Sequence, residues 1–142
     1  MTGPAAVAVA VTFTWVGLVV GISFIEAPLK FRAPGVTTPI GLGIGRLVFR
    51  ALNSVETVLA VVLGATLFVG LGDTTAAGAL VVAIVALVVQ LLAVRPPLTR
   101  RSDLILAGGD APRSGAHHAY VALESVKLVA LLVGGVATLL TL

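Results

Sequence analysis

Four long stretches without a charged residue divide this chain of 142 residues. They cover residues 1–25, 57–72, 74–94 and 128–142 and consist mostly of Ala, Val, Leu and Gly. About 20 consecutive apolar residues are enough for a helix to cross the hydrocarbon core of a bilayer. With the adjoining helical turns included, the pattern predicts four transmembrane helices, over about residues 4–26, 44–72, 74–94 and 116–140.

Turn-forming residues separate the predicted helices. A proline disfavours helical geometry at the residue before it, so we expect Pro28 to end or kink the first helix. We likewise expect Pro96 and Pro97 to stop the third helix. Between the second and third helices, Asp73 or Thr74 is a suitable N-cap after a tight turn.

The connections define the predicted architecture. Residues 27–43 and 95–115 are expected to be loops, and short connections make neighbouring helices antiparallel. The sequence therefore predicts an all-α polytopic membrane protein, with an antiparallel four-helix bundle that forms a single membrane domain over residues 1–142.

Composition supports a bilayer as the solvent of this chain. Hydrophobic residues make up 58% of it and charged residues 11%, whereas about a quarter of a soluble domain is charged. The net charge of +3 is not accompanied by the exposed basic face that a nucleic-acid partner would need. The absence of Cys excludes disulfides, thiolate metal sites and cysteine nucleophiles.

The basic residues all belong to one side of the predicted bundle. They are Lys30, Arg32, Arg46, Arg50, Arg95, Arg100, Arg101, Arg113 and Lys127, whereas Asp73 is the single charge at the other end. Short loops rich in Lys and Arg stay in the cytoplasm. We therefore expect both basic connections inside, both termini outside, and a location in a bacterial inner membrane.

Polar residues of all four helices are expected at one depth near the cytoplasmic edge. At about 1.5 Å of rise per residue, Glu56 and Glu124 both lie about 25 Å or slightly more from the outer surface. Gln90 lies about 7 to 8 Å from the inner end of its helix, and Glu26 is at the inner end of the first. These depths predict a layer in which polar side chains of different helices meet.

Helical periodicity supports this convergence. Residues three or four apart are neighbours on a helix, so two stripes form: Arg46, Arg50, Asn53 and Glu56 on the second helix, and His117, Tyr120, Glu124 and Lys127 on the fourth. We expect Glu124 to pair with Lys127, and Glu26 to reach Lys30 only if its helix continues past Pro28.

Two interpretations of this polar layer remain open: a structural network of ion pairs, and a functional site built on it. The candidate ligand-binding residues are Glu26, Asn53, Glu56, Gln90, His117, Tyr120 and Glu124, with Lys30, Arg46, Arg50 and Lys127 as their charge partners.

Two further motifs have less specific meanings. His117 and His118, with Glu56 and Glu124, have the ligand types of a metal site in a four-helix bundle. The Glu-x-x-His spacing of such sites is absent, so a metal is not the favoured interpretation and no cofactor is assigned. Gly17 and Gly21 form a GxxxG motif, which allows close helix contact either within the bundle or between protomers.

Two resemblances to known families bear on function. Arg50, Asn53 and Glu56 resemble the Arg-Ala-x-x-Asn-x-x-Glu segment of the membrane-associated eicosanoid and glutathione metabolism family, although the Arg-to-Asn spacing is one residue short. That family would imply a trimeric, glutathione-using enzyme. Residues 21–31, 45–49, 53–56 and 118–127 are more similar to a group of small bacterial four-span proteins. This group is distantly similar to the eukaryotic transmembrane protein associated with platinum-drug resistance, and it implies no particular reaction.

Three functions are compatible with the sequence. The leading hypothesis is a small, oligomeric membrane protein that binds or transports a small polar or ionic solute through a cytoplasm-facing polar vestibule. The second is a membrane-embedded enzyme that uses a metal, haem or a lipid-soluble substrate there. The third is a structural accessory subunit of a larger membrane complex. The expected partners are the lipid bilayer and either further copies of the chain or other subunits.

Overall fold

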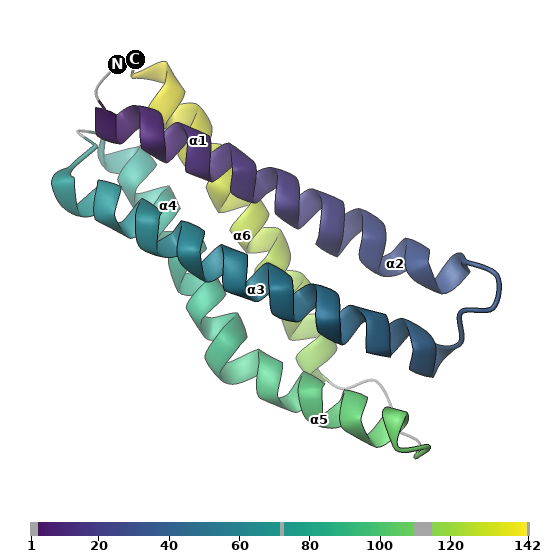
Figure 1. The fold of residues 1–142 in the computed structure, drawn as a ribbon. Coiled ribbons are helices and arrows are strands. Elements are labelled where there is room, and N and C mark those ends of the chain that lie inside the picture. Colours follow the sequence, from purple (N-terminus) through teal and green to yellow (C-terminus); the bar gives the residue numbers. More distant parts are fainter. Residues whose placement is uncertain (1–2, 72, 110–114, 142) are drawn as a thin grey trace.

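Four long helices form the protein (Figure 1). The computed structural model describes residues 3–71, 73–109 and 115–141, and all the regular elements within them are helical. The helices that are long and apolar enough to cross a membrane are Gly3–Arg32, Thr38–Val69, Thr74–Leu106 and His117–Leu140. The prediction of an all-α, four-helix membrane fold is confirmed. Both ends of the chain lie at one end of the bundle (Figure 1); which side of the membrane they face stays a prediction.

Two of the long helices are composite. The first consists of α1 (Gly3–Leu18), the π-helix η1 (Val19–Glu26), α2 (Ala27–Leu29) and the 3-10 turn η2 (Lys30–Arg32). The third consists of α4 (Thr74–Val89), the π-helix η3 (Gln90–Val94) and α5 (Arg95–Leu106). The other two are the single helices α3 (Thr38–Val69) and α6 (Gly115–Leu140).

Pro28 does not end the first helix, contrary to one of the two outcomes expected. Proline lacks an N–H and its ring collides with the carbonyl four residues earlier in an α-helix. Here a π-helical segment precedes it, in which the N–H of Ala27 bonds to the carbonyl of Ile22. Such local widening accommodates proline within membrane helices. The backbone therefore stays helical as far as Arg32, and Ala33 is extended.

The same arrangement overturns the predicted stop at Pro96 and Pro97. The π-helix η3 comes directly before them, and the N–H of Arg95 bonds to the carbonyl of Gln90. Residues 95–106, expected to be loop, instead form α5. This continuation lays α5 beside α3 (Figure 1). Arg113, from the same predicted loop, lies outside the described residues.

The second long helix starts earlier than the predicted residue 44. Thr37 is its N-cap and accepts a hydrogen bond from the N–H of Ile40 at 3.4 Å. Pro39 is compatible with this first turn, where an N–H has no helical partner. At the other end, Asp73 is the N-cap of the two predicted candidates: its Oδ2 accepts from the N–H of Ala76 at 3.0 Å.

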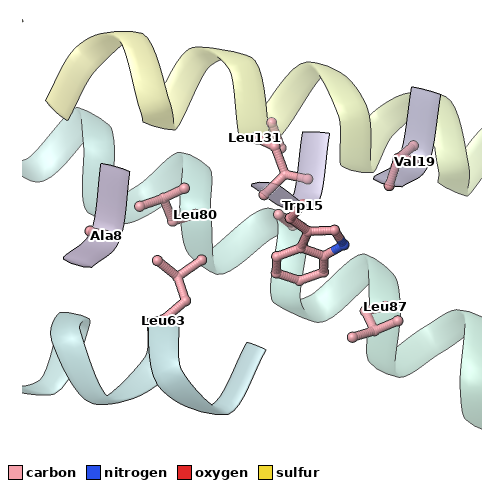
Figure 2. Close-up of a cluster of buried hydrophobic side chains, with 9 residues drawn as sticks. Ala8, Trp15, Val19, Leu63, Leu80, Leu87 and Leu131 are labelled. Carbon is pink, nitrogen blue, oxygen red and sulfur yellow. The ribbon is translucent and has the colours of Figure 1, made fainter. Parts of the chain in front are cut away.

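Close contact of α6 with α4 and α1 organises the half of the bundle that holds the chain termini. Figure 2 shows Trp15 from α1, Leu80 and Leu87 from α4, and Leu131 from α6 in one cluster. Lipid tails are as apolar as these side chains, so packing rather than the hydrophobic effect holds membrane helices together. Tight packing is visible at Gly134, where an added Cβ would lie 2.5 Å from Cδ2 of Leu80.

The GxxxG motif is not part of this packing. An added Cβ at Gly17 or Gly21 would have nothing within 4 Å, so among the described residues the motif makes no close helix contact within the bundle. The outward face of the third long helix carries a stripe of exposed apolar side chains: Val81, Val85, Val88 and Leu92. A surface of this kind is suited to lipid.

Candidate functional site

A buried lysine lies where the helices meet. The Lys127 side chain of α6 is 0% exposed. Its Nζ is 2.5 Å from Oε2 of Glu56 and 2.5 Å from Oε1 of Glu124. It also donates to Oε1 of Gln90 at 2.9 Å. The predicted Glu124–Lys127 pair is therefore present, and residues from α3, η3 and α6 meet at one ammonium group.

The first long helix completes this arrangement with two donors. Nε1 of Trp15 donates to Oε2 of Glu56 at 2.7 Å, and Oγ of Ser23 donates to Oε2 of Glu124 at 2.5 Å. The hydroxyl of Tyr120 donates to the same Glu124 oxygen at 3.0 Å. All four long helices thus contribute, but the first does so through Trp15 and Ser23 and not through the predicted Glu26. We call this set the Lys127 cluster: Trp15, Ser23, Glu56, Gln90, Tyr120, Glu124 and Lys127.

The charges of the Lys127 cluster do not balance. With every group ionised, Glu56 and Glu124 bring two negative charges and Lys127 one positive charge. Oε1 of Glu56 is buried and has no hydrogen-bond partner among the described residues. Uptake of one proton would make the cluster formally neutral. Because unpaired charge within a membrane is costly, the shared lysine is what makes two buried carboxylates tolerable.

A cavity of about 760 Å³ lies at the end of the bundle opposite the chain termini. We call it the inner cavity, after the side of the membrane on which the distribution of Lys and Arg is expected to place it. It lies between α3, α5, the end of the first long helix and the start of α6, and its volume is in the range of sites that hold a drug-sized molecule. Its polar or charged lining residues are Ser23, Lys30, Arg46, Arg50, Asn53, Ser54, Thr57, Arg95, Thr99, Arg101, Ser102, His117 and Tyr120.

Aromatic rings position two of the lining cations. The guanidinium of Arg95 lies 5.2 Å from the ring centroid of Phe49 and 5.1 Å from that of Tyr120. The two rings meet edge to face at 5.9 Å. Nζ of Lys30 is 5.5 Å from the Phe49 centroid. Cation–π contacts of this length are attractive, and more so away from water.

The predicted site residues divide into two groups by depth. Within each stripe, the residues nearer the basic end line the inner cavity: Arg46, Arg50 and Asn53 on α3, and His117 and Tyr120 on α6. The deeper residues Glu56, Glu124 and Lys127 belong to the Lys127 cluster, with Gln90. Ser23 and Tyr120 belong to both and so connect the cavity with Glu124.

Glu26 stands apart from the Lys127 cluster. Its Oε2 is 3.6 Å from Nζ of Lys30, and its side chain is 35% exposed. This contact forms because the helix continues past Pro28, which the sequence predicted to be necessary for Glu26 to reach Lys30. Glu26 is therefore the partner of one lining cation rather than a lining residue itself.

The charge partners differ from those predicted. Only Lys30 and Lys127 pair with glutamates among the described residues. Arg46 instead lies 2.7 Å from Oδ1 of Asp103, and Arg50 has no ion pair in the described part of the chain. The reason is the continuation of the third long helix through its two prolines, which brings Asp103 on α5 against α3.

The possible metal ligands do not converge. In the described ranges, no group of three or more His, Asp or Glu side chains could hold a metal ion. Glu56 and Glu124 face Lys127, whereas His117 lines the inner cavity and His118 is exposed. The two histidine rings are 5.7 Å apart with planes at 74°, as expected for adjacent residues on a helix.

Sequence reasoning missed several residues of this region, among them Trp15, Phe49 and Asp103. Trp15 is not among the residues predicted from the sequence, although a buried indole N–H needs an acceptor, and that need was the available signal. Phe49 had no distinguishing feature in the sequence. Asp103 was assigned to a loop, because the helix through Pro96 and Pro97 was not foreseen.

Loss of either hydroxyl donor to Glu124 should destabilise the protein. Hydrogen bonds to charged groups contribute about 1.5–3 kcal/mol, so we expect Ser23→Ala and Tyr120→Phe each to lower the unfolding temperature in detergent. Ser125→Ala is the matched control, because its hydroxyl bonds only to the carbonyl of Val121 and its loss should have little effect. Equal effects of Ser23→Ala and Ser125→Ala would contradict the assigned role of Ser23.

Comparisons with known proteins assign no family to this site. No protein-family model, no curated protein and no solved structure matches the chain. The inner cavity and the Lys127 cluster are therefore the features of the molecule that bear on its function.

Proposed function

We propose that this integral membrane protein binds a small polar or ionic solute in the inner cavity and moves it across the membrane. The observation that carries the proposal is the cavity itself, with its volume of about 760 Å³ and its polar lining from all four long helices. A structural ion-pair network alone would not require such a space. The cavity also adjoins the Lys127 cluster through Ser23 and Tyr120, so a bound solute could affect the charge of the cluster.

The proposal places the cavity on the cytoplasmic side. Its basic lining belongs to the end of the bundle that the distribution of Lys and Arg assigns to the cytoplasm. Location in a bacterial inner membrane, kinship with the small bacterial four-span proteins, and self-association are parts of the same proposal. Self-association is included because four helices enclose little volume, and a continuous path would need more than one copy.

Solute flux into proteoliposomes tests the proposal. We expect the wild-type protein to admit at least one solute from a panel of labelled anions, cations and neutral polar molecules. Asn53→Leu should lower the flux several-fold, because it replaces a polar lining side chain with an apolar one of similar size. Thr141→Val is the control at the far end of α6, away from the cavity, and should leave the flux unchanged. Background flux of every solute for the wild-type protein would contradict transport.

A role as an accessory subunit is the second candidate, and the Lys127 cluster favours it. Every charged group of this cluster is almost fully buried, and together its members tie the four long helices to one another. Such a network could serve only to fix the packing. In that case Asn53→Leu would leave flux at background and unchanged, and a partner protein would co-purify from native membranes.

A further inference from the structure

We infer that the inner cavity selects an organic anion, with a carboxylate or phosphate group attached to an apolar body. The inference deepens the proposed function, because it names the class of solute for the same cavity. It depends on the sign of the lining charge, on the state of Arg95 and on the apolar part of the lining.

The lining charge is positive throughout. Five Lys or Arg side chains line the cavity, and no Asp or Glu does among the described residues. Glu26 and Asp103 neutralise Lys30 and Arg46 from outside the lining. Of the other three, Arg101 has an interaction of its own, whereas Arg50 and Arg95 have no ion pair in the described part of the chain. Several like charges around one concave space attract an ion of opposite sign.

Arg95 is the strongest single indication. Its Nε and Nη2 are buried and have no hydrogen-bond partner in the described ranges. Leaving buried hydrogen-bond donors of a charged group unsatisfied is costly. The Phe49 and Tyr120 rings fix the guanidinium in position, but they accept none of its hydrogen bonds in this structure. Guanidinium presents a planar fork of donors that matches carboxylate and phosphate, so an anion would compensate this charge.

The rest of the lining fits an apolar body. Phe24, Phe31, Leu42, Leu98 and Val121 contribute apolar surface to the same cavity. Gly41 allows the Phe31 ring to lie against α3, since an added Cβ there would overlap that ring. A cavity of about 760 Å³ is also far larger than an inorganic anion needs. Charge and size together indicate an amphipathic anion.

Two sources could supply this chemistry: a soluble organic anion from the cytoplasm, and the headgroup of an anionic phospholipid. Phenylphosphate represents the soluble source, and phosphatidylglycerol the lipid source. Benzyl alcohol and benzylamine are the control probes. Both carry the same ring, but benzyl alcohol is uncharged and benzylamine is positively charged. Binding of each probe would be measured by calorimetry on the full chain in an uncharged maltoside detergent, after mass spectrometry has shown that bound lipid is removed.

We expect phenylphosphate or phosphatidylglycerol to bind one molecule per chain, and benzyl alcohol and benzylamine to bind far more weakly. Arg50→Gln and Arg95→Gln should each weaken anion binding by about tenfold, as the loss of a charge-assisted contact predicts. Arg100→Gln is the matched control: it removes the same charge from α5, but Arg100 is exposed and does not line the cavity. Arg50 is also exposed, so its variant remains informative if Arg95→Gln does not fold.

The lipid arm distinguishes the two sources. Competition between phosphatidylglycerol and phenylphosphate would support the inference with a lipid headgroup as the ligand. If added phosphatidylglycerol leaves phenylphosphate binding unchanged, the inference would be supported with a soluble anion as the ligand. Absence of binding by both anions, or equal losses in Arg50→Gln and Arg100→Gln, would overturn it. Preferential binding of benzylamine would overturn the anion inference and leave the proposed function standing.

Discussion

Replacement of Lys127 by Met should strongly destabilise this protein. Met has a similar length and fits a buried site, but it removes the ammonium that Glu56 and Glu124 share. Removing one partner of a buried ion pair costs about 3–5 kcal/mol. We expect Lys127→Met to lower the yield of folded protein strongly, or to lower its unfolding temperature in detergent. The single Trp provides a second readout, because Trp15 donates to Glu56 and its emission should shift.

The same cluster offers a rescue experiment. Neutralising the carboxylates as well, in the triple variant Lys127→Met, Glu56→Gln and Glu124→Gln, should restore much of the stability, because no charge is then left unpaired. Arg100→Met is the control, because it removes a cation that is exposed and not buried. A Lys127→Met protein as stable as the wild type would show that the ion pairs do not hold the helices together.

Substitution of Gly134 by Ala should also destabilise the protein. An added Cβ would lie 2.5 Å from Cδ2 and 2.7 Å from Cγ of Leu80, and 3.4 Å from the carbonyl oxygen of Ala76. Leu80 is fully buried and has little room to move, so α4 and α6 would have to separate. Overpacking of this kind costs about 1–3 kcal/mol. Thermal unfolding in detergent measures the loss.

Two further variants isolate the packing effect. Gly78→Ala is the matched control in α4, because an added Cβ there has nothing within 4 Å; it should be neutral, or stabilising by up to about 1 kcal/mol from helix propensity. Combining Gly134→Ala with Leu80→Ala should remove the collision and recover part of the loss. Similar effects of Gly134→Ala and Gly78→Ala would contradict the close approach.

The division between cavity and cluster makes function and stability separable. Arg50 and Asn53 line the inner cavity without belonging to the Lys127 cluster, so their substitution should change solute binding more than folding. Lys127 and Glu56 are buried beneath the inner cavity, so their substitution should change folding more than solute binding. A transport assay on Glu56→Gln alone would confuse the two effects. The variants that test function therefore come from the lining.

The structure agrees with the sequence where the prediction depended on depth and periodicity. Glu56, Gln90, Glu124 and Lys127 meet because each is a known distance along a helix of regular rise, and because residues three and four apart share a face. The N-cap at Asp73 followed from local chemistry in the same way. These predictions concern distances within one helix or the level of a residue in the bilayer.

The errors arose where backbone geometry depends on more than local sequence. Pro96 and Pro97 were expected to stop a helix, yet the π-helix η3 accommodates them and α5 follows. The pairing of Arg46 with Asp103 follows from that continuation, as does the position of Arg95 between Phe49 and Tyr120. None of these contacts could be derived from the spacing of residues within one segment.

The sequence by itself determined the solvent, the number of spanning helices and the level of the polar layer, because hydrophobic run length, charge placement and helical rise are properties of one segment at a time. Only the tertiary structure decided which charges neutralise one another and which remain around a cavity. The physical reason is that pairing between helices depends on their rotation and separation, which are set by contacts such as the close approach of Gly134 to Leu80. Those contacts bury Lys127 with two glutamates and leave Arg50 and Arg95 at the inner cavity.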